Sequence, residues 1–435
     1  MTATIEIFRG GTWVPAARLV PADTDQGYLG ACKFDYVLEY AAEFAGLETA
    51  QAAGVSCQYP ADFQPYDLKR WPAFILDILP SGYGRQQWLE QLELQDGPRA
   101  DWPLLINGTA YPPGNLRTAE AVASKDPNTL VPTADGDEVA MCEHPGFQEA
   151  DVIGRTEAFV EYAFQHGIYA AGASDVQGVA PKLLVNQDKA GAWHAEGRLE
   201  DVDVASYWLV KRPRGNRTAD RQVLRNEAAY MRVASVIGLR VHAELRWQDD
   251  NLFVPRFDRK IRDGNVVRYG MESLCSASGI AEYGARVPHE VLCNTILRHS
   301  SRVEEDLVEY LQRDVANVVL GNKDNHARNT ALLRFEDGKV ELAPLFDFAP
   351  MYLDPEGIAR VCRWNADIEH AGNPDWQQVI NLFPEHVDLL TERLRQLGHA
   401  IEQLADTMRD CGVDDDIIEQ RNHAIERHAR QLLAL

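Results

Sequence analysis

Long apolar segments are missing from this chain of 435 residues. No run of 18 apolar residues occurs, which excludes an ordinary membrane-spanning helix. The N-terminal residues MTATIEIFRG also lack the apolar core of a secretion signal. We therefore expect a cytoplasmic protein that has no membrane partner.

Cysteines are few and scattered. The seven cysteines are odd in number, and none stands in a C-x-x-C pair. This pattern argues against a zinc site and against a disulfide framework. We expect reduced thiols at Cys32, Cys57, Cys142, Cys275, Cys293, Cys362 and Cys411.

Basic residues are also scarce, with 43 Lys and Arg against 66 Asp and Glu and a net charge of −23. Charge of this sign repels nucleic acid over most of a protein surface. We expect DNA binding only indirectly, through a partner protein. What is present, 45% apolar and 25% charged residues, is typical of a globular protein, and the length suits two or three domains.

One stretch, Gly321–Asp347, concentrates the residues that could carry chemistry, GNKDNHARNTALLRFEDGKVELAPLFD. Asp324 and Asn329 stand in the spacing D-x-x-x-x-N. Two β-type runs around an Asp-Gly pair at 337–338 predict a hairpin. If that pair forms the centre of the turn, the register places Asn329 opposite Phe346 and beside Asp347.

An amide and a carboxylate at one end of a hairpin suit Mg²⁺, which binds few protein oxygens and keeps other positions for water and phosphate. Asp324, on the preceding loop, could then orient a hydroxyl nucleophile. Base, amide ligand and acid ligand are the arrangement of a kinase. The spacing alone also occurs by chance in polar surface loops, and a lone histidine such as His326 is more often structural than catalytic.

Upstream residues predict a scaffold of strands and helices. Residues 1 to about 30 read as a hairpin around a Gly-Gly turn. From Phe34 to Leu94 the apolar residues follow a helical period, with a buried stripe of Ile75, Leu76 and Leu79. These segments predict core rather than catalytic function.

The chain from Asp151 has the order of a kinase small lobe. A helix closed by Gly167 precedes an apolar strand, PKLLV, and a second strand, YWLVK, that ends at Lys211. The loop GNRTADRQV leads to a helix from about Val223 to Ile237, with Glu227 in its first turns, and then to a hairpin turning at 249–251. Glu227 could pair with Lys211.

Lys211 is the candidate for binding phosphate, because an ammonium group is otherwise poorly placed at the end of an apolar strand. The alternative is a strand-end lysine that reaches solvent. Gly172 and Gly178, among small residues, would let backbone N–H groups approach phosphate oxygens. Their loop matches neither G-x-x-x-x-G-K-[ST] nor G-x-G-x-x-G.

An ordered set of motifs over residues 150–350 resembles the HipA family of bacterial serine/threonine protein kinases, the toxins of HipA–HipB toxin–antitoxin pairs. The set is more specific than any single member of it. The motifs are GASDVQGVAPK, YWLVKRPRG, RNEAAYMRVASVIGL, VPRFDRK, GNKDNHARN and LAPLFDFAP.

The resemblance implies roles for particular residues. Asp324 would be the catalytic base, and Asn329 and Asp347 would hold Mg²⁺. Lys211 would contact ATP, with Glu227 near it. The other residues implied to bind nucleotide are the phosphate-facing loop Gln177, Gly178, Val179, Ala180, Pro181 and Lys182, the hinge residues Pro255, Arg256 and Phe257 near the adenine, and His326, Arg328 and Phe346.

The sequence departs from the family pattern in three places, one of which is the loop GVAPK, where a Gln at the Ala180 position is absent. The family's loop usually carries a serine that is autophosphorylated to switch the enzyme off, but Asp175 stands there and Ser174 is adjacent. We hypothesise that Ser174 takes over that role, or that Asp175 supplies negative charge permanently. Asp347 is followed by Phe348-Ala349, without the glycine of D-F-G, so the flip of eukaryotic kinases is not expected.

We expect an α/β (α+β), bilobed, protein-kinase-like fold, with a mixed β/α N-terminal lobe and a mainly helical C-terminal lobe. The expected domains are 1–150, an N-terminal HipA-type subdomain; 151–258, the kinase small-lobe core; and 259–435, the helical lobe with the catalytic loop and metal-binding acid.

The expected function is transfer of the γ-phosphoryl of Mg-ATP to Ser or Thr of a protein substrate. The resemblance implies an aminoacyl-tRNA synthetase as the known type of substrate, growth inhibition, and neutralisation by a helix-turn-helix antitoxin like HipB. The alternatives are a phosphotransferase acting on a small molecule or lipid, and a degenerate kinase that acts as a binding module.

Overall fold

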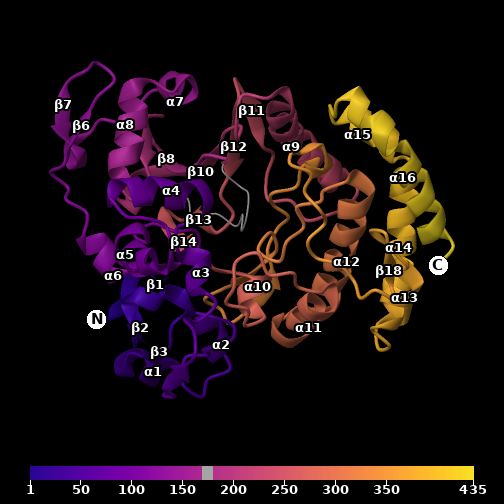
Figure 1. Ribbon diagram of the computed structural model, residues 1–435, viewed down its shortest axis with the longest axis horizontal. Helices are drawn as coiled ribbons and strands as arrows, with labels where there is room; N and C mark the ends of the chain where they lie inside the picture. Colours follow the sequence, from indigo (N-terminus) through magenta and orange to yellow (C-terminus); the bar gives the residue numbers. More distant parts are fainter. Residues whose placement is uncertain (169–179) are drawn as a thin grey trace. The chain divides into compact units, whose positions relative to one another are not determined.

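The computed structural model describes residues 1–168 and 180–435 and divides into two compact units (Figure 1). Unit 1 comprises Met1–Arg214, Gln248–Gly284 and Ala331–Val340; unit 2 comprises Gly215–Trp247, Ala285–Thr330 and Glu341–Leu435. Strands and helices occur in both, so the predicted mixed α/β class is confirmed. The division into 1–150, 151–258 and 259–435 stays a prediction.

Unit 1 begins with the predicted hairpin, formed by β1 (Ala3–Arg9) and β2 (Thr12–Pro21). Gly10 and Gly11 form its turn at φ +59° and +80°, which glycine adopts without strain. The strands join an antiparallel sheet in the order β4-β3-β2-β1-β5, with β3 at Cys32–Tyr36, β4 at Tyr66–Leu68 and β5 at Leu116–Thr118.

The prediction of helical structure from Phe34 onward is wrong at β3 and β4. In β3, Cys32, Phe34 and Tyr36 are buried in alternation with less buried residues, which is the period of a strand. Helices follow as predicted around the buried residues Ile75, Leu76 and Leu79. They are α1 (Leu38–Phe44), α2 (Ala50–Ala53), α3 (Ile75–Ile78) and α4 (Gly82–Gln91). Two further helices, α5 (Pro98–Gly108) and α6 (Ala119–Ala123), lie beyond the segment predicted to be helical.

A second antiparallel sheet in unit 1 runs in the order β12-β10-β8-β9. Its strands are β8 (Lys182–Asp188), β9 (Trp193–Ala195), β10 (Val204–Lys211) and β12 (Asn251–Pro255). The predicted helix before it is α8 (Glu157–His166), closed by Gly167 at φ +70°. Phe159, Trp193 and Phe253 belong to the core on which this sheet packs.

Shorter elements complete unit 1. They are β6 (Leu130–Pro132), β7 (Glu138–Ala140), α7 (Glu149–Gly154), the hairpin β13 (Arg259–Arg262) and β14 (Asn265–Arg268), β15 (Gly270–Ser273), α10 (Leu274–Ala277) and β16 (Ala331–Arg334). Strand β15 pairs antiparallel with β16.

Unit 2 is mainly helical. Helices α14 and α16 lie side by side, and α12 packs against both (Figure 1). The bounds are α9 (Thr218–Val236), α11 (His289–His299), α12 (Val303–Leu320), α13 (Trp376–Asn381), α14 (Val387–Glu402), α15 (Leu404–Asp410) and α16 (Asp415–Leu433), with short strands β11 (Arg246–Gln248), β17 (Val340–Leu342, at the border), β18 (Glu369–His370) and β19 (Asn373–Pro374).

Helix α9 starts earlier than predicted, because residues assigned to the loop GNRTADRQV are helical from Thr218. Asp220 lies in the first turn, where a negative charge stabilises the helix N-terminus. Gln222 donates to Asp414 at 3.1 Å. Polar contacts to a distant segment therefore extend a helix that has few apolar residues at this end.

All seven cysteines lie among the described residues, where each is a free thiol, and five of them are buried. Among the described residues, no helix is both long and apolar enough to cross a membrane.

Candidate active site

The predicted catalytic segment begins where α12 ends. Gly321 closes the helix at φ +76°, a conformation that favours glycine. A Cβ atom at Gly321 would also stand 2.7 Å from Cδ1 of the Tyr352 ring. The two constraints together fix the direction in which the loop leaves the helix.

The loop after α12 folds Asn329 back toward Asp324. The backbone N–H of Asn329 donates to the His326 carbonyl at 2.9 Å, and its side-chain Nδ2 donates to the Asp324 carbonyl at 2.8 Å. The spacing D-x-x-x-x-N thus connects the two residues through the backbone of Asp324. The Asp324 carboxylate is one-quarter exposed and lies 3.6 Å from Nε2 of His326.

The turn of the predicted hairpin is one residue longer than expected. The Phe335 N–H donates to the Lys339 carbonyl at 2.9 Å, and the Gly338 N–H donates to the Phe335 carbonyl at 3.1 Å. Gly338 has φ +95°, as in a three-residue loop that ends in a bulge. The predicted two-residue turn, and with it the register that set Asn329 opposite Phe346, is wrong by one position.

Asp347 is held by its neighbours in the chain. The Leu345 N–H donates to the Arg240 carbonyl at 2.7 Å. Phe348 is buried, with its ring centroid 5.6 Å from that of Tyr230. Asp347 itself has φ +56°, a conformation that is uncommon outside glycine and that concentrates at functional sites.

Asp324, Asn329 and Asp347 line one pocket in unit 2, together with His326 and Phe346. About 20 Å³ of this pocket admits a water-sized sphere, which is enough for a water molecule or an ion. The structure therefore brings together the three residues that the sequence singled out.

The side chains in this pocket fit a magnesium ion. Among the described residues, no group donates a hydrogen bond to the buried Oδ1 of Asn329, although buried polar atoms are normally bonded. No set of three or more His, Cys, Asp or Glu in the described chain is placed to hold a metal. An amide and a carboxylate are nevertheless a set that Mg²⁺ accepts, because water and phosphate complete its coordination.

Two lysines occupy the end of the second sheet in unit 1. Lys182 on β8 and Lys211 on β10 are direct partners across the two strands, and Lys211 is buried. Pro181 precedes Lys182 and accepts a hydrogen bond from the Arg212 N–H at 3.0 Å.

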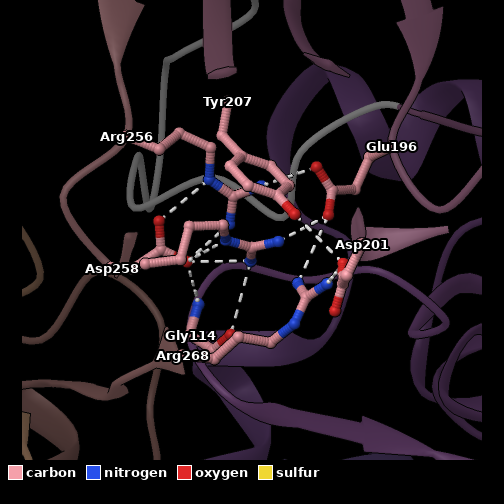
Figure 2. Close-up of polar contacts among 8 residues, drawn as sticks. Gly114, Glu196, Asp201, Tyr207, Arg256, Asp258 and Arg268 are labelled. Carbon is pink, nitrogen blue, oxygen red and sulfur yellow. Dashed lines mark hydrogen bonds and ion pairs between the residues drawn. The ribbon is translucent and has the colours of Figure 1, made fainter. Parts of the chain in front are cut away.

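Arg256 was predicted to lie at the hinge, and its side chain forms ion pairs with residues of unit 1. Figure 2 shows its guanidinium pointing toward Asp258 and Glu196. Nε donates to Asp258 Oδ1 at 2.9 Å and Nη2 to Oδ2 at 2.6 Å, while Nη1 lies 3.3 Å from Glu196. The backbone of Pro255 to Phe257 is therefore anchored by a buried ion pair, and its contact with adenine stays a prediction.

For the other predicted residues in the described chain, the structure gives a position in the fold, which by itself does not test the predicted role. Glu227 is buried on α9 and Arg328 is buried in the loop after α12, while Ala180 precedes β8. Pairing of Glu227 with Lys211 stays a prediction, as do the nucleotide contacts of Ala180, Arg328 and Phe346. Ser174, Asp175, Gln177, Gly178 and Val179 lie outside the described residues.

Sequence reasoning missed the polar side chains that hold the segment after Asp347. Asn325 donates from Nδ2 to the Cys362 carbonyl at 3.0 Å, and its Oδ1 accepts from the Val361 N–H at 3.1 Å. Asp314 on α12 accepts from Trp364 Nε1 at 2.8 Å and pairs with Arg360. Both residues also line the pocket of Asp324.

The protonation states of Asp314 and His289 follow from their burial and from the charges beside them. Burial alone would raise the pKa of Asp314, but Arg360 and His289 lower it below its ordinary value. Burial lowers the pKa of His289 to about 4, so at neutral pH Asp314 and Arg360 form the charged pair while His289 stays neutral. The sequence offered one signal for these contacts: Asp314 lies beside the apolar face of a predicted helix, and an acid is rarely buried there without a partner.

A family model described as the HipA-like C-terminal domain matches residues 174–428, more than half of the chain. The chain belongs to the HipA family. The resemblance read from the motifs is thereby confirmed, and the fold is kinase-like. The matched region contains the whole pocket of Asp324, Asn329 and Asp347.

Two similar proteins bear on the comparison. The structure of the Shewanella oneidensis toxin–antitoxin complex of HipA, HipB and operator DNA aligns with 99% of this chain and 96% of that chain, at a TM-score of 0.63 and 18% identity. This shows a common fold. The provisionally named kinase Y4mE of Sinorhizobium fredii is 34% identical over 141 residues, which span 30% of this chain and 33% of Y4mE.

Proposed function

We propose that this chain is a HipA-like toxin kinase that transfers the γ-phosphoryl group of Mg-ATP to a Ser or Thr hydroxyl of a protein. One observation carries the proposal: Asp324, Asn329 and Asp347 line one pocket, in which Asn329 has a buried oxygen that accepts no hydrogen bond from the described residues. Phosphoryl transfer depends on positioning and charge neutralisation more than on covalent chemistry, and these groups suit that task.

Each side chain would have a separate role. Asn329 and Asp347 would hold Mg²⁺, which when bound neutralises charge on the phosphates. The Asp324 carboxylate would orient the acceptor hydroxyl and take its proton, while the oxygen–phosphorus bond to the acceptor forms and the bond to ADP breaks. Lys211 and Lys182 would contact the phosphates with their ammonium groups.

We further propose a helix-turn-helix antitoxin of the HipB kind as the binding partner that neutralises the toxin in the cytoplasm. Support comes from the Shewanella complex, whose components are HipA, HipB and operator DNA. A net charge of −23 opposes direct contact with DNA. The chain would therefore reach DNA through the antitoxin.

The proposal predicts ATP-dependent phosphorylation of a cellular protein. Cell lysate incubated with ATP, magnesium and the full chain should gain phosphoserine or phosphothreonine at a small set of sites, and Asp324→Ala should reduce this gain by about 10²-fold or more, because a general base supplies that factor. Quantitative phosphoproteomics compares the two proteins.

Radiolabelled ATP in the same lysate distinguishes the alternatives. Label that appears only in small molecules or lipids would replace the protein-kinase proposal. Growth inhibition that survives both Asp324→Ala and Asp347→Asn would show that toxicity does not depend on phosphoryl transfer.

A further inference from the structure

A second pocket in unit 2, of about 370 Å³, is lined by three arginines. We call it the basic pocket, and define it by Arg286, Pro288, Arg360, Arg363, Trp364 and Ala366. No acidic side chain of the described residues lines it. In a chain with a net charge of −23, such a concentration of positive charge requires an explanation.

Two of the three arginines have charge available for a ligand. Arg360 is largely compensated, because it pairs with Asp314 and lies 3.0 Å from Glu369. Arg286 and Arg363 are exposed, and neither forms an ion pair with any described residue. Arg363 uses only its Nε, which donates to the Arg360 carbonyl at 3.1 Å.

The walls of the basic pocket are held in place by hydrogen bonds. The His289 N–H, next to Pro288, donates to the Arg363 carbonyl at 3.1 Å. Trp364 is 3% exposed, and its ring stacks on that of His289 at 5.0 Å between centroids. The nearby carboxylate of Glu290 accepts from the Asn365 N–H at 2.9 Å, outside the lining.

The basic pocket is linked to the pocket of Asp324 through side chains that line the latter, among them Asp314, which pairs with Arg360, and Asn325. Asn325, the residue after Asp324, bonds the backbone at Val361 and Cys362, between Arg360 and Arg363. The backbone between Arg360 and Arg363 is therefore bonded to the residue that follows Asp324, whose carboxylate is proposed to orient the acceptor hydroxyl.

We infer that the basic pocket docks an acidic segment of the protein substrate, with Asp or Glu side chains near the phosphorylated Ser or Thr. This inference rests on the proposed kinase function and adds a class of substrate. Carboxylates bind guanidinium groups through paired, charge-assisted hydrogen bonds. The charge of the remaining surface is screened beyond about 8 Å at physiological ionic strength, so the local arginines would determine the preference.

An acidic peptide fits these observations better than nucleic acid does. The pocket is small and walled by Pro288 and Trp364, whereas a nucleic-acid groove would need positive charge along an extended surface. A long polyanion would also extend beyond the pocket, over a surface whose net negative charge opposes its binding.

The test uses the full chain with Mg-ATP and two libraries of fluorescent Ser/Thr peptides, one with glutamate flanks and one with lysine flanks. The acidic library should be phosphorylated at least about 10-fold more efficiently, through KM, because charged hydrogen bonds supply such a factor. Arg286→Glu combined with Arg363→Glu should abolish or reverse the preference. Arg298→Glu, an exposed arginine on α11 outside the pocket, should keep it.

Binding of the same peptides, followed by fluorescence anisotropy, decides the outcome if neither library is phosphorylated. Tighter binding of the acidic library that the double variant loses supports docking. Equal binding by the double variant, a preference for lysine flanks, or arginine-dependent binding of tRNA alone overturns the inference. Magnesium-dependent ATP binding is measured in parallel, so failure of the kinase function itself is seen separately.

Discussion

Asp347→Asn should reduce phosphoryl transfer by about 10²-fold or more while the protein remains folded. The substitution removes the negative charge that would hold Mg²⁺, and stabilisation of developing charge at an active site is worth a factor of this size. Asparagine tolerates positive φ, so the backbone conformation of Asp347 at φ +56° should persist. Steady-state rates at several magnesium concentrations provide the measurement.

The matched control is Asp388→Asn, which removes an exposed carboxylate on α14 in the same unit. It should leave the rates unchanged. If Asp347→Asn were as active as the wild type at limiting magnesium, Asp347 would not be a metal ligand, whatever the fate of Asp324.

Asp258→Asn should destabilise unit 1 by about 3–5 kcal/mol, because it leaves buried arginines without their partner. Asp258 binds Arg256 in bidentate fashion, lies 2.9 Å from Nη2 of Arg259, and accepts from the Gly114 N–H at 2.7 Å. Burial alone would raise the pKa of Asp258, but Arg256 and Arg259 hold it far below its ordinary value. Denaturant unfolding at pH 7 measures the loss.

The same contact predicts a dependence on pH. In the unfolded chain an aspartate titrates near about 3.9, so the stabilisation by the Asp258 carboxylate is complete above about pH 5 and declines as the pH falls below about 4. The difference between wild type and Asp258→Asn should therefore shrink in acid. Asp263→Asn, at an exposed turn with φ +51°, should have little effect, and a constant difference down to pH 3 would contradict this account.

The sequence predicted local structure best where one signal dominated. The Gly-Gly turn between β1 and β2 and the Gly167 end of α8 were both located correctly. The hairpin around Gly338 was recognised, but its register was not, because an Asp-Gly pair serves two-residue and three-residue loops alike. Only the hydrogen bonds of Phe335 distinguish the two.

Polar contacts between residues far apart in the chain could not be predicted from the sequence. The spacing of Asp324 and Asn329 identified the candidate site, yet nothing local indicates that Asn325 binds the backbone at Val361 and Cys362. Similarly, the motif VPRFDRK gives no sign that Glu196, some 60 positions upstream, meets Arg256. Such contacts depend on how distant segments pack, which periodicity does not encode.

Isothermal titration calorimetry of ATP into the full chain tests the central claim most directly. With magnesium, the wild type should bind ATP at least about 10-fold more tightly than with EDTA, and Asn329→Leu together with Asp347→Asn should lose that difference. ATP uptake that is absent, or equally tight without magnesium, would contradict the account.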